Sequence, residues 1–355
     1  MFSVPKILLA ACTAAVLAAT AGCSGDSAAG SGSGAGKLVL STFPFGVDQF
    51  QKAIVDPFTA ATGIKVEIET GSNADRLSKL QVAKGKPTAD VVLISDYYAA
   101  LGQQDNLFQP VTAAKVPNVG AIAPFATEQA YLGPAYSYQL NGTIYSTTAM
   151  SAAEAASWDV YSGKHAKKVA LPDISVTAGQ LMVSGVAATY GSGPYDIDTA
   201  LKTLGGWAPG VLKFYSSSTE VTNLLTQGEI VAADSLNGFA TQLVASGAKI
   251  AWTPPATGKY MATNRAMVTT GARNADNADK FIDYLLSAEA QTKSAELVGD
   301  LPVNPKATVP SSITAVVGDI AKDPVAAGYT TLDPKQIVPT RKDWVERFAR
   351  EVTGA

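Results

Sequence analysis

The chain has 355 residues, a formal net charge of −3, two cysteines and one histidine. The histidine, His165, lies in a lysine-rich segment typical of a solvated loop, which argues against histidine-dependent catalysis and metal binding. The chain has no long basic run, so nucleic acid is not expected as a partner. Roughly 320 residues follow the N-terminal segment, more than one simple core usually organises, and we therefore expect two lobes.

The first residues have the pattern of a secretion signal. Lys6 precedes an apolar run over residues 7–17, which is too short to span a bilayer comfortably. We expect residues 1–22 to be a signal peptide that is removed. Because Cys12 lies inside it, the mature protein would contain no internal disulfide and would depend on burial for its stability.

The segment that ends at Cys23 resembles a lipobox. Residues 17–23 read LAATAGC, with small side chains before the cysteine and Thr20 where an aliphatic residue is usual. We expect Cys23 to carry a diacylglyceryl lipid and residues 23–36, rich in Ser, Gly and Ala, to form a flexible tether. The alternative is an ordinary cleaved signal with an incidental cysteine.

Strands and helices alternate after this segment. Residues 37–41 predict a strand, 47–62 a helix, and 64–69 a half-exposed strand with alternating apolar and charged side chains. A further helix is expected at 74–83. The apolar run at 91–94 is typical of a parallel strand that is covered on both faces.

The second half repeats this alternation. Residues 221–227 predict a helix and 230–233 a buried strand, and the stretch from 278 to 299 predicts two consecutive helices with Ser287 as the cap of the second. Near the end, Asp343 and Glu346 form a plausible capping pair before an apolar stripe of Trp344, Phe348 and Val352. The alternation of strands and helices indicates the α/β class.

Several segments, taken in order, resemble a known family. Residues 157–159 read SWD and 168–173 read KVALPD. Residues 215–229 read YSSSTEVTNLLTQGE, and 279–291 read DKFIDYLLSAEAQ, followed by PVNP at 302–305. This series is similar to solute-binding proteins of ABC importers, and it is nearest to the spermidine/putrescine-type branch.

The resemblance implies a two-lobe, type II periplasmic-binding-protein-like α/β fold with crossover hinge strands. We expect residues 37–135 and 260–355 in the first lobe, 136–259 in the second, and crossings near 133–138 and 252–259. The implied function is capture of a small-molecule solute by hinge closure and delivery to the transmembrane subunits of an ABC permease. The resemblance also implies an extracytoplasmic monomer, held at the cell membrane through Cys23, without cofactor or metal.

The expected ligand contacts lie on loops after strand ends, where helix N-termini offer free N–H groups. Each candidate could equally serve as a cap or a turn, and Ser218 and Thr219 are the plainest caps. The candidate ligand-binding residues are Phe43, Phe45, Asp96, Tyr97, Asp173, Ser175, Thr177, Ser217, Ser218, Glu220, Asp234, Asn237, Tyr260 and Asn264.

Two ligand classes remain open. Members of the polyamine branch hold ammonium groups with carboxylates and tryptophans, but this chain has Leu236, Ala262 and Asn264 at corresponding positions. Hydroxyls at 175–177 and 216–219 suit a phosphonate, a carboxylate or another polar organic solute. Four acids keep a polyamine-like cation or an amphoteric solute open: Asp96, Asp173, Glu220 and Asp234.

Two other functional classes are alternatives to a transport receptor, for which we assign no catalytic residue. An exported lipoprotein enzyme of the same fold would need a convergent acid/base pair, and composition alone does not exclude paired carboxylates. An adhesin would need no ligand pocket. A thermal shift on adding a solute would separate a receptor from an adhesin, and turnover would identify an enzyme.

Overall fold

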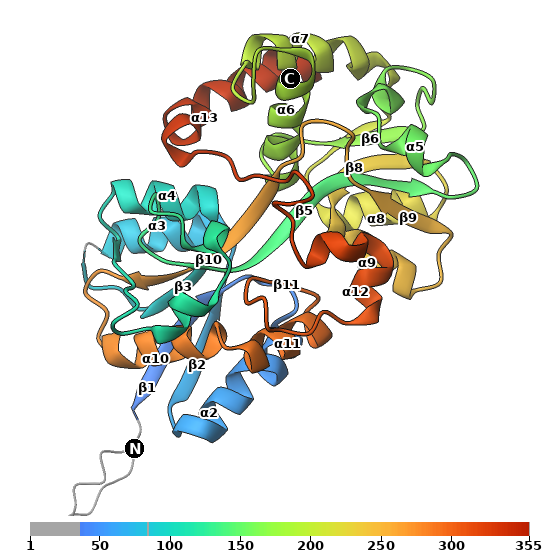
Figure 1. The fold of residues 1–355 in the computed structure, drawn as a ribbon. Helices are drawn as coiled ribbons and strands as arrows, with labels where there is room; N and C mark the ends of the chain where they lie inside the picture. Colours follow the sequence, from blue (N-terminus) through green and yellow to red (C-terminus); the bar gives the residue numbers. More distant parts are fainter. Residues whose placement is uncertain (1–35, 84, 355) are drawn as a thin grey trace, which may run out of the picture. The chain divides into compact units, whose positions relative to one another are not determined.

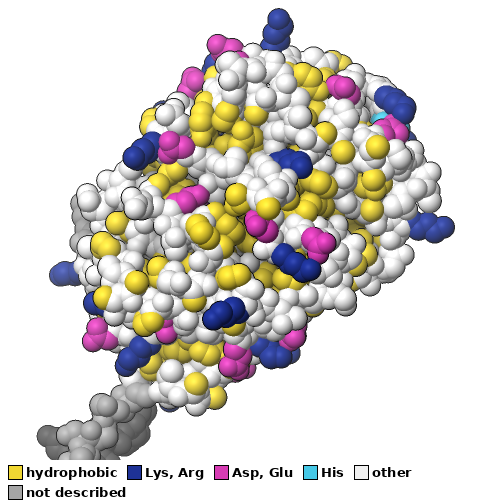
Figure 2. Space-filling model, in the orientation of Figure 1, with side chains coloured by type: hydrophobic (Ala, Val, Ile, Leu, Met, Phe, Trp, Pro, Cys, Tyr) yellow, Lys and Arg dark blue, Asp and Glu magenta, His cyan; other side chains and the backbone are white. Residues whose placement is uncertain are grey.

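The computed structural model describes residues 36–83 and 85–354. The expected signal peptide and Cys23 lie outside the described residues. Within the described part, none of the helices is long and apolar enough to cross a membrane. On the face drawn in Figure 2, basic and acidic side chains are interspersed rather than gathered into areas of one sign.

The first sheet holds the N-terminal strands. Its order is β2 (Lys65–Thr70), β1 (Lys37–Thr42), β3 (Val91–Ser95), β10 (Met261–Thr269) and β5 (Ala135–Ser146). Strands β1 and β2 are parallel, and so are β1 and β3, whereas β10 runs antiparallel to both of its neighbours. The fully buried β3 confirms the strand predicted from its continuous apolar run, although only its β1 side is a parallel pairing.

The second sheet begins where the first ends, on β5. Its order continues through β8 (Ala232–Leu236), β6 (Val169–Pro172) and β7 (Lys213–Tyr215). Strand β9 (Ile250–Thr253) also pairs with β5. The buried strand predicted at 230–233 therefore exists, but it begins two residues later because Ile230 still bonds back to the preceding helix.

Strand β5 passes from one sheet to the other (Figure 1). Leu140 is still paired with β10, whereas Asn141 is the first residue paired with β8. The chain returns to the first sheet between β9 and β10. The two-lobe α/β fold with crossover strands is thus confirmed. The first crossing lies slightly later than expected, and the return falls where the sequence predicted it.

Helices flank both sheets because their apolar faces have no other place to be buried. Phe50, Ile54 and Phe58 share a core with Phe281, whose ring meets that of Phe58 edge-on at 5.2 Å. The helix predicted over 47–62 is continuous but contains a π-helical turn, and it ends at Gly63, whose φ is 70°. In this lobe the helices are α1 (Val47–Phe50), the π-turn Gln51–Val55, α2 (Asp56–Thr62), α3 (Asn73–Ala83), α4 (Asp96–Gln104), α10 (Ala275–Leu285) and α11 (Ala288–Leu297).

The remaining α-helices surround the second sheet. They are α5 (Ala152–Ala155), α6 (Thr177–Tyr190), α7 (Ile197–Trp207), α8 (Ser218–Thr226), α9 (Asn237–Ala245), α12 (Ser311–Val317) and α13 (Pro334–Phe348). The two helices predicted between 278 and 299 are confirmed as α10 and α11, and Ser287 Oγ accepts the Ala290 N–H as the predicted cap.

The C-terminal helix differs most from expectation. Helix α13 begins at Pro334 with Asp333 as its cap, so Asp343 and Glu346 lie inside it rather than at its start. The predicted stripe of Trp344, Phe348 and Val352 is buried, but it packs with the side chains around α6 and α7. Helix α13 also contacts α4, so it touches helices flanking both sheets. Grouping residues 260–355 with the first lobe did not anticipate this packing.

Candidate functional site

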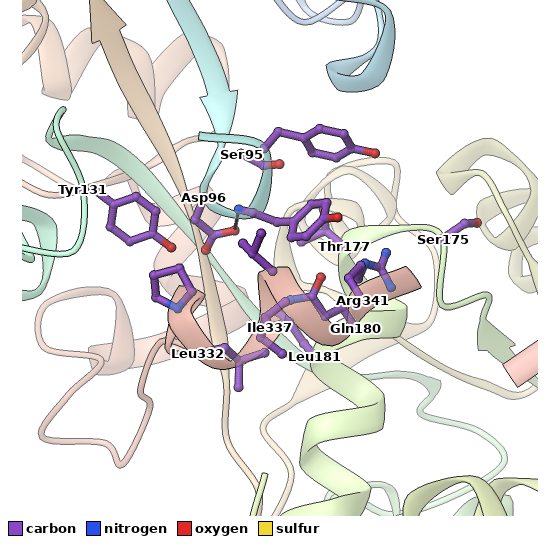
Figure 3. Close-up of a pocket in the computed structure, with 14 residues that line it drawn as sticks. Ser95, Asp96, Tyr131, Ser175, Thr177, Gln180, Leu181, Leu332, Ile337 and Arg341 are labelled. Atoms are coloured by element: carbon purple, nitrogen blue, oxygen red, sulfur yellow. Dashed lines mark hydrogen bonds between the residues drawn. The ribbon is translucent and has the colours of Figure 1, made fainter. Parts of the chain in front are cut away.

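A pocket lies where the starts of α4 and α6 face α13 (Figure 3). Its cavity volume is about 30 Å³, well below that of small-molecule sites, so a solute would require its walls to move apart. We call it the α13 pocket. Its lining residues are Ser95, Asp96, Tyr97, Tyr98, Tyr131, Ser175, Thr177, Gln180, Leu181, Leu332, Pro334, Ile337, Val338 and Arg341.

Asp96 forms the corner between β3 and α4. Its Oδ2 accepts the Thr263 N–H at 3.0 Å, and its Oδ1 accepts the Tyr97 N–H at 2.7 Å. Burial raises the pKa of Asp96, while these hydrogen bonds and the charge of Arg265 oppose the shift. The side chain therefore ties α4 to β10 and at the same time forms a wall of the pocket.

Three tyrosines line the same space. The rings of Tyr97 and Tyr98 meet edge-on with centroids 5.0 Å apart. The ring of Tyr131 lies under the guanidinium of Arg265, at 3.6 Å. Within the described residues, no hydrogen bond is made by the hydroxyl of Tyr97, Tyr98 or Tyr131. These hydroxyls are therefore free to meet a solute.

The opposite wall is the start of α6. Asp173, which follows β6, accepts the Ser175 N–H at 2.8 Å and so shapes the turn into the helix. The N-cap residue, Val176, supplies no side-chain hydrogen bond to the first turn. The unpaired N–H groups of a helix start attract anions and other acceptors. The pocket thus brings together four of the residues expected to contact ligand, Asp96, Tyr97, Ser175 and Thr177, whereas Asp173 is not among its lining residues.

Sequence reasoning missed Arg341. Its guanidinium carbon lies 5.4 Å from the centroid of Tyr97, although the residue belongs to α13, far along the chain. Burial lowers the pKa of Arg341, and Tyr97, Tyr98 and Asp173 oppose that shift. One signal was available, because Arg341 stands three residues before Trp344 and seven before Phe348, on the face of the helix that carries the apolar stripe.

Three other candidates meet in a second pocket, which we call the Phe43 pocket. Phe43 and Phe45 lie with ring centroids 5.4 Å apart, and Asn264 donates to Ser137 Oγ at 3.1 Å. Asp300 lines this pocket too and accepts from Ser294 Oγ at 2.7 Å. Burial raises the pKa of Asp300 to about 6, with hydrogen bonds from Ser294 and Ser137 opposing the shift.

The two pockets adjoin the same pair of strands. Ser95 of β3 lines the α13 pocket, and its register partner on β10, Asn264, lines the Phe43 pocket. Neighbouring strands lie about 5 Å apart, so the two spaces are close to one another.

Ser217 and Glu220, at the start of α8, are not among the residues that line either pocket. Ser217 Oγ accepts the Glu220 N–H at 3.3 Å as the N-cap, and Glu220 Oε2 accepts the N–H of Ser216, the residue before the cap, at 3.3 Å. Glu220 also pairs with Lys213 at 3.2 Å. Ser218 is the first residue of α8. The capping explanation therefore accounts for Ser217 and Glu220.

Three further candidates are buried near the crossover. Asp234 accepts from Asn141 Nδ2 at 3.0 Å, and burial raises its pKa well above the ordinary value. Asn237 Oδ1 accepts the Leu140 N–H at 2.8 Å. The Tyr260 carbonyl accepts the Asn141 N–H at 3.1 Å, and its side chain is buried. All three hold β5 in place where it changes sheets, and none lines either pocket.

Metal binding gains no support from side-chain clusters. In residues 36–83 and 85–354, no group of three or more His, Cys, Asp or Glu side chains could hold a metal ion. The chemistry available in the α13 pocket is hydrogen bonding by hydroxyls, an amide and a guanidinium, together with aromatic stacking.

Known proteins share this sequence and fold. A 2-aminoethylphosphonate-binding periplasmic protein of Salmonella typhimurium, so named provisionally, is 26% identical over 265 residues, covering 71% of this chain and 74% of the relative. Spermidine/putrescine-binding periplasmic protein 1 of Haemophilus influenzae is 24% identical, covering 74% and 75%. A crystal structure of an ABC transporter from Clostridium perfringens superposes with a TM-score of 0.76 at 27% identity, covering 89% of this chain and 99% of that one.

A family model gives the broader assignment. The model of the bacterial extracellular solute-binding proteins matches residues 53–323, which include both crossovers and most of the lining of the α13 pocket. Since the match covers well over half of the chain, and the two-lobe fold agrees with it, the protein belongs to the bacterial extracellular solute-binding protein family.

Proposed function

We propose that the protein is the extracytoplasmic receptor of an ABC importer and that it captures a small polar organic solute in the α13 pocket. The observation that carries this proposal is the composition of that pocket. Its walls come from α4 beside the first sheet and α6 beside the second, and they hold polar side chains that lack partners among the described residues. A solute seated there would touch both lobes at once.

Such a site suits capture by closure. The lobes are joined through β5 and through the segment between β9 and β10, and rotation about these strands would open or close the space between α4 and α6. A solute that contacts both lobes stabilises the closed arrangement by its differential affinity for that state. A permease that recognises the closed form would then distinguish loaded from empty receptor.

The site assignment is tested by affinity. A thermal-shift screen of purified protein against polyamines, thiamine-like cations, phosphonates, amino acids and sugars identifies a binding class. With a solute from that class, Tyr97→Ala and Asp173→Ala should weaken binding about tenfold or more without unfolding the protein, because each loses a direct or turn-forming contact. Phe45→Ala is the matched comparison, since Phe45 is 71% exposed and lines only the Phe43 pocket.

The outcomes separate the two pockets. Weakening by Tyr97→Ala and Asp173→Ala, with Phe45→Ala neutral, supports the α13 pocket. Weakening by Phe45→Ala alone would place the solute in the Phe43 pocket. A protein that shows no thermal shift with any of the classes would contradict the receptor proposal itself.

Membrane attachment through Cys23 is part of the same proposal. The lipobox-like segment at 17–23 supports lipid on Cys23, and a tethered receptor meets its permease at a raised effective concentration. Cys23→Ser should release the protein from the membrane fraction into the medium or the periplasm while solute affinity stays unchanged. Retention of the variant in membranes would contradict the lipid anchor, whereas the proposal that the protein binds a solute would stand unchanged.

A further inference from the structure

Helix α13 carries a charged residue on its buried face. Ile337, Arg341, Trp344 and Phe348 follow one another at spacings of four, three and four, which places them on one side of the helix. All four are buried, and Arg341 is only 7% exposed. Burying a guanidinium costs free energy unless hydrogen bonds or an opposite charge compensate it.

Two other buried arginines have hydrogen-bond or ion-pair partners that compensate the cost of their burial. Arg76 donates four hydrogen bonds, to the carbonyls of Gly71, Ser41 and Leu93 and to the Asn73 side chain. Arg265 pairs with Glu128 at 2.9 Å and donates to a backbone carbonyl. Each is thus tied to neighbouring parts of the fold.

Arg341 has no such partners. In the described part of the chain it makes no hydrogen bond and no ion pair, and its Nη1 is fully buried and unbonded. Its guanidinium carbon lies over the ring of Tyr97, 5.4 Å from the ring centroid. In Figure 3 the Arg341 side chain lies near the labelled Thr177, at the start of α6, among the residues that line the α13 pocket.

The uncharged polar groups around Arg341 can donate hydrogen bonds as well as accept them. Gln180, only 8% exposed, has no side-chain hydrogen bond within the described residues, and the hydroxyls of Tyr97 and Thr177 are likewise unbonded. The uncapped start of α6 adds positive potential. Among the described lining residues Asp96 is the one carboxylate, and both its oxygens already accept hydrogen bonds.

We propose that Arg341 binds the anionic end, a carboxylate or a phosphonate, of the solute that this pocket takes. The inference rests on the proposed function and deepens it by naming the charge of the ligand. A guanidinium matches such oxyanions with two parallel N–H···O bonds, and Thr177 and Gln180 are placed to donate to the remaining oxygens. A dication would instead bring ammonium groups next to a guanidinium that has no ion-pair partner among the described residues.

Three small molecules test the charge directly. Putrescine and 4-aminobutyrate share a short chain and one amino group but end in an ammonium and a carboxylate respectively, and 2-aminoethylphosphonate ends in a phosphonate. Thermal shift and isothermal titration calorimetry with the full-length protein should show binding of at least one of the two anionic compounds and none of putrescine. Binding of putrescine in preference to both anionic compounds overturns the proposal, and so does the absence of binding by both.

Variants then assign the contact to Arg341. Arg341→Met should weaken binding of the anionic compound about 10- to 100-fold, the usual worth of a hydrogen bond to a charged group. Arg341→Lys keeps the charge without the planar fork and should fall between Arg341→Met and the unaltered protein. Lys342→Met is the control, because Lys342 is exposed on the same helix and pairs with Glu346.

Two results separate this proposal from the pocket assignment. If Tyr97→Ala weakens binding and Arg341→Met does not, the solute occupies the α13 pocket but the anion contact is wrong. If both weaken binding and the Arg341→Met protein melts no earlier than the unaltered protein without ligand, the loss is one of recognition rather than of folding, as proposed.

Discussion

The α13 pocket and the Phe43 pocket lie beside the same pair of strands but leave opposite charges without an ionic partner. In the α13 pocket the group is the Arg341 guanidinium, and in the Phe43 pocket it is the Asp300 carboxyl, which accepts from Ser294 and meets no cation within ion-pair distance among the described residues. The pKa of Asp300 is raised only to about 6, so this carboxyl is mostly ionised at neutral pH.

Burial alone does not distinguish a charged side chain that stabilises the fold from one that is available to a ligand. The distinguishing feature is whether the side chain has an ion-pair partner within the protein. Arg265 is as buried as any side chain in the protein, yet it is balanced by Glu128 and lies over Tyr131. Arg341 is also buried and lines the same pocket as Asp96, but it forms no ion pair with any described residue. The presence of an ion-pair partner at Arg265 and the lack of one at Arg341 therefore lead to different predictions for stability.

The largest effect is expected at Arg265, which is paired with Glu128. Arg265→Met should lower the free energy of unfolding by about 3 to 5 kcal/mol, because it leaves Glu128 and the buried Asp96 without their cation. Urea denaturation at pH 7 measures the change. A double variant with Glu128→Gln should recover part of the loss, and equal stability of Arg265→Met and the unaltered protein would show that the pair contributes little.

A smaller effect is expected from pH at the Phe43 pocket. Asp300 has an ordinary pKa of 3.8 and a pKa of about 6 in the folded protein, so the folded state binds more protons between these values. Its contribution therefore lowers stability as pH rises from about 4 to about 6, by at most about 3 kcal/mol, and partial exposure of the side chain reduces this.

Asp300→Asn isolates that contribution. The variant keeps an acceptor for Ser294 but cannot ionise, so its unfolding free energy should fall less steeply over this pH range. Urea titrations at pH 4, 5, 6 and 7 compare the two proteins. Parallel pH profiles would mean that Asp300 is already solvated or paired, and the contrast between the pockets would then rest on Arg341 alone.

Much of the fold could be predicted from local patterns. Apolar periodicity located the helices around Phe58, Phe281 and Leu285, and Ser287 identified a cap, because such signals depend on neighbours within one or two turns. The start of α13 was placed wrongly because Asp343 and Glu346 imitate a capping pair in the middle of a helix that in fact begins after Asp333.

The site was less accessible to sequence reasoning. Loops after strand ends suggested Asp96, Tyr97, Ser175 and Thr177 as ligand contacts, and these four residues line one pocket because strand order brings those ends together. Arg341 was missed because it reaches the pocket from a helix that follows the last strand, and no local pattern says which strand ends a C-terminal helix will face. The one indication in the sequence was that Arg341 stands at a position where the apolar spacing of the helix predicts a core residue.

The smallest effect is expected at Arg341, and it is the one that tests most directly whether this residue serves the fold or a ligand. Arg341→Met should raise the free energy of unfolding of the ligand-free protein by about 1 kcal/mol, because it removes an uncompensated buried charge and places an apolar side chain beside Ile337 and Trp344. Urea denaturation without solute measures the change, with Lys342→Met as the exposed control that should leave stability unaltered. A clear loss of stability in Arg341→Met would mean that the guanidinium is needed by the fold, as Arg265 is, and would remove the physical reason for reserving it for an anion.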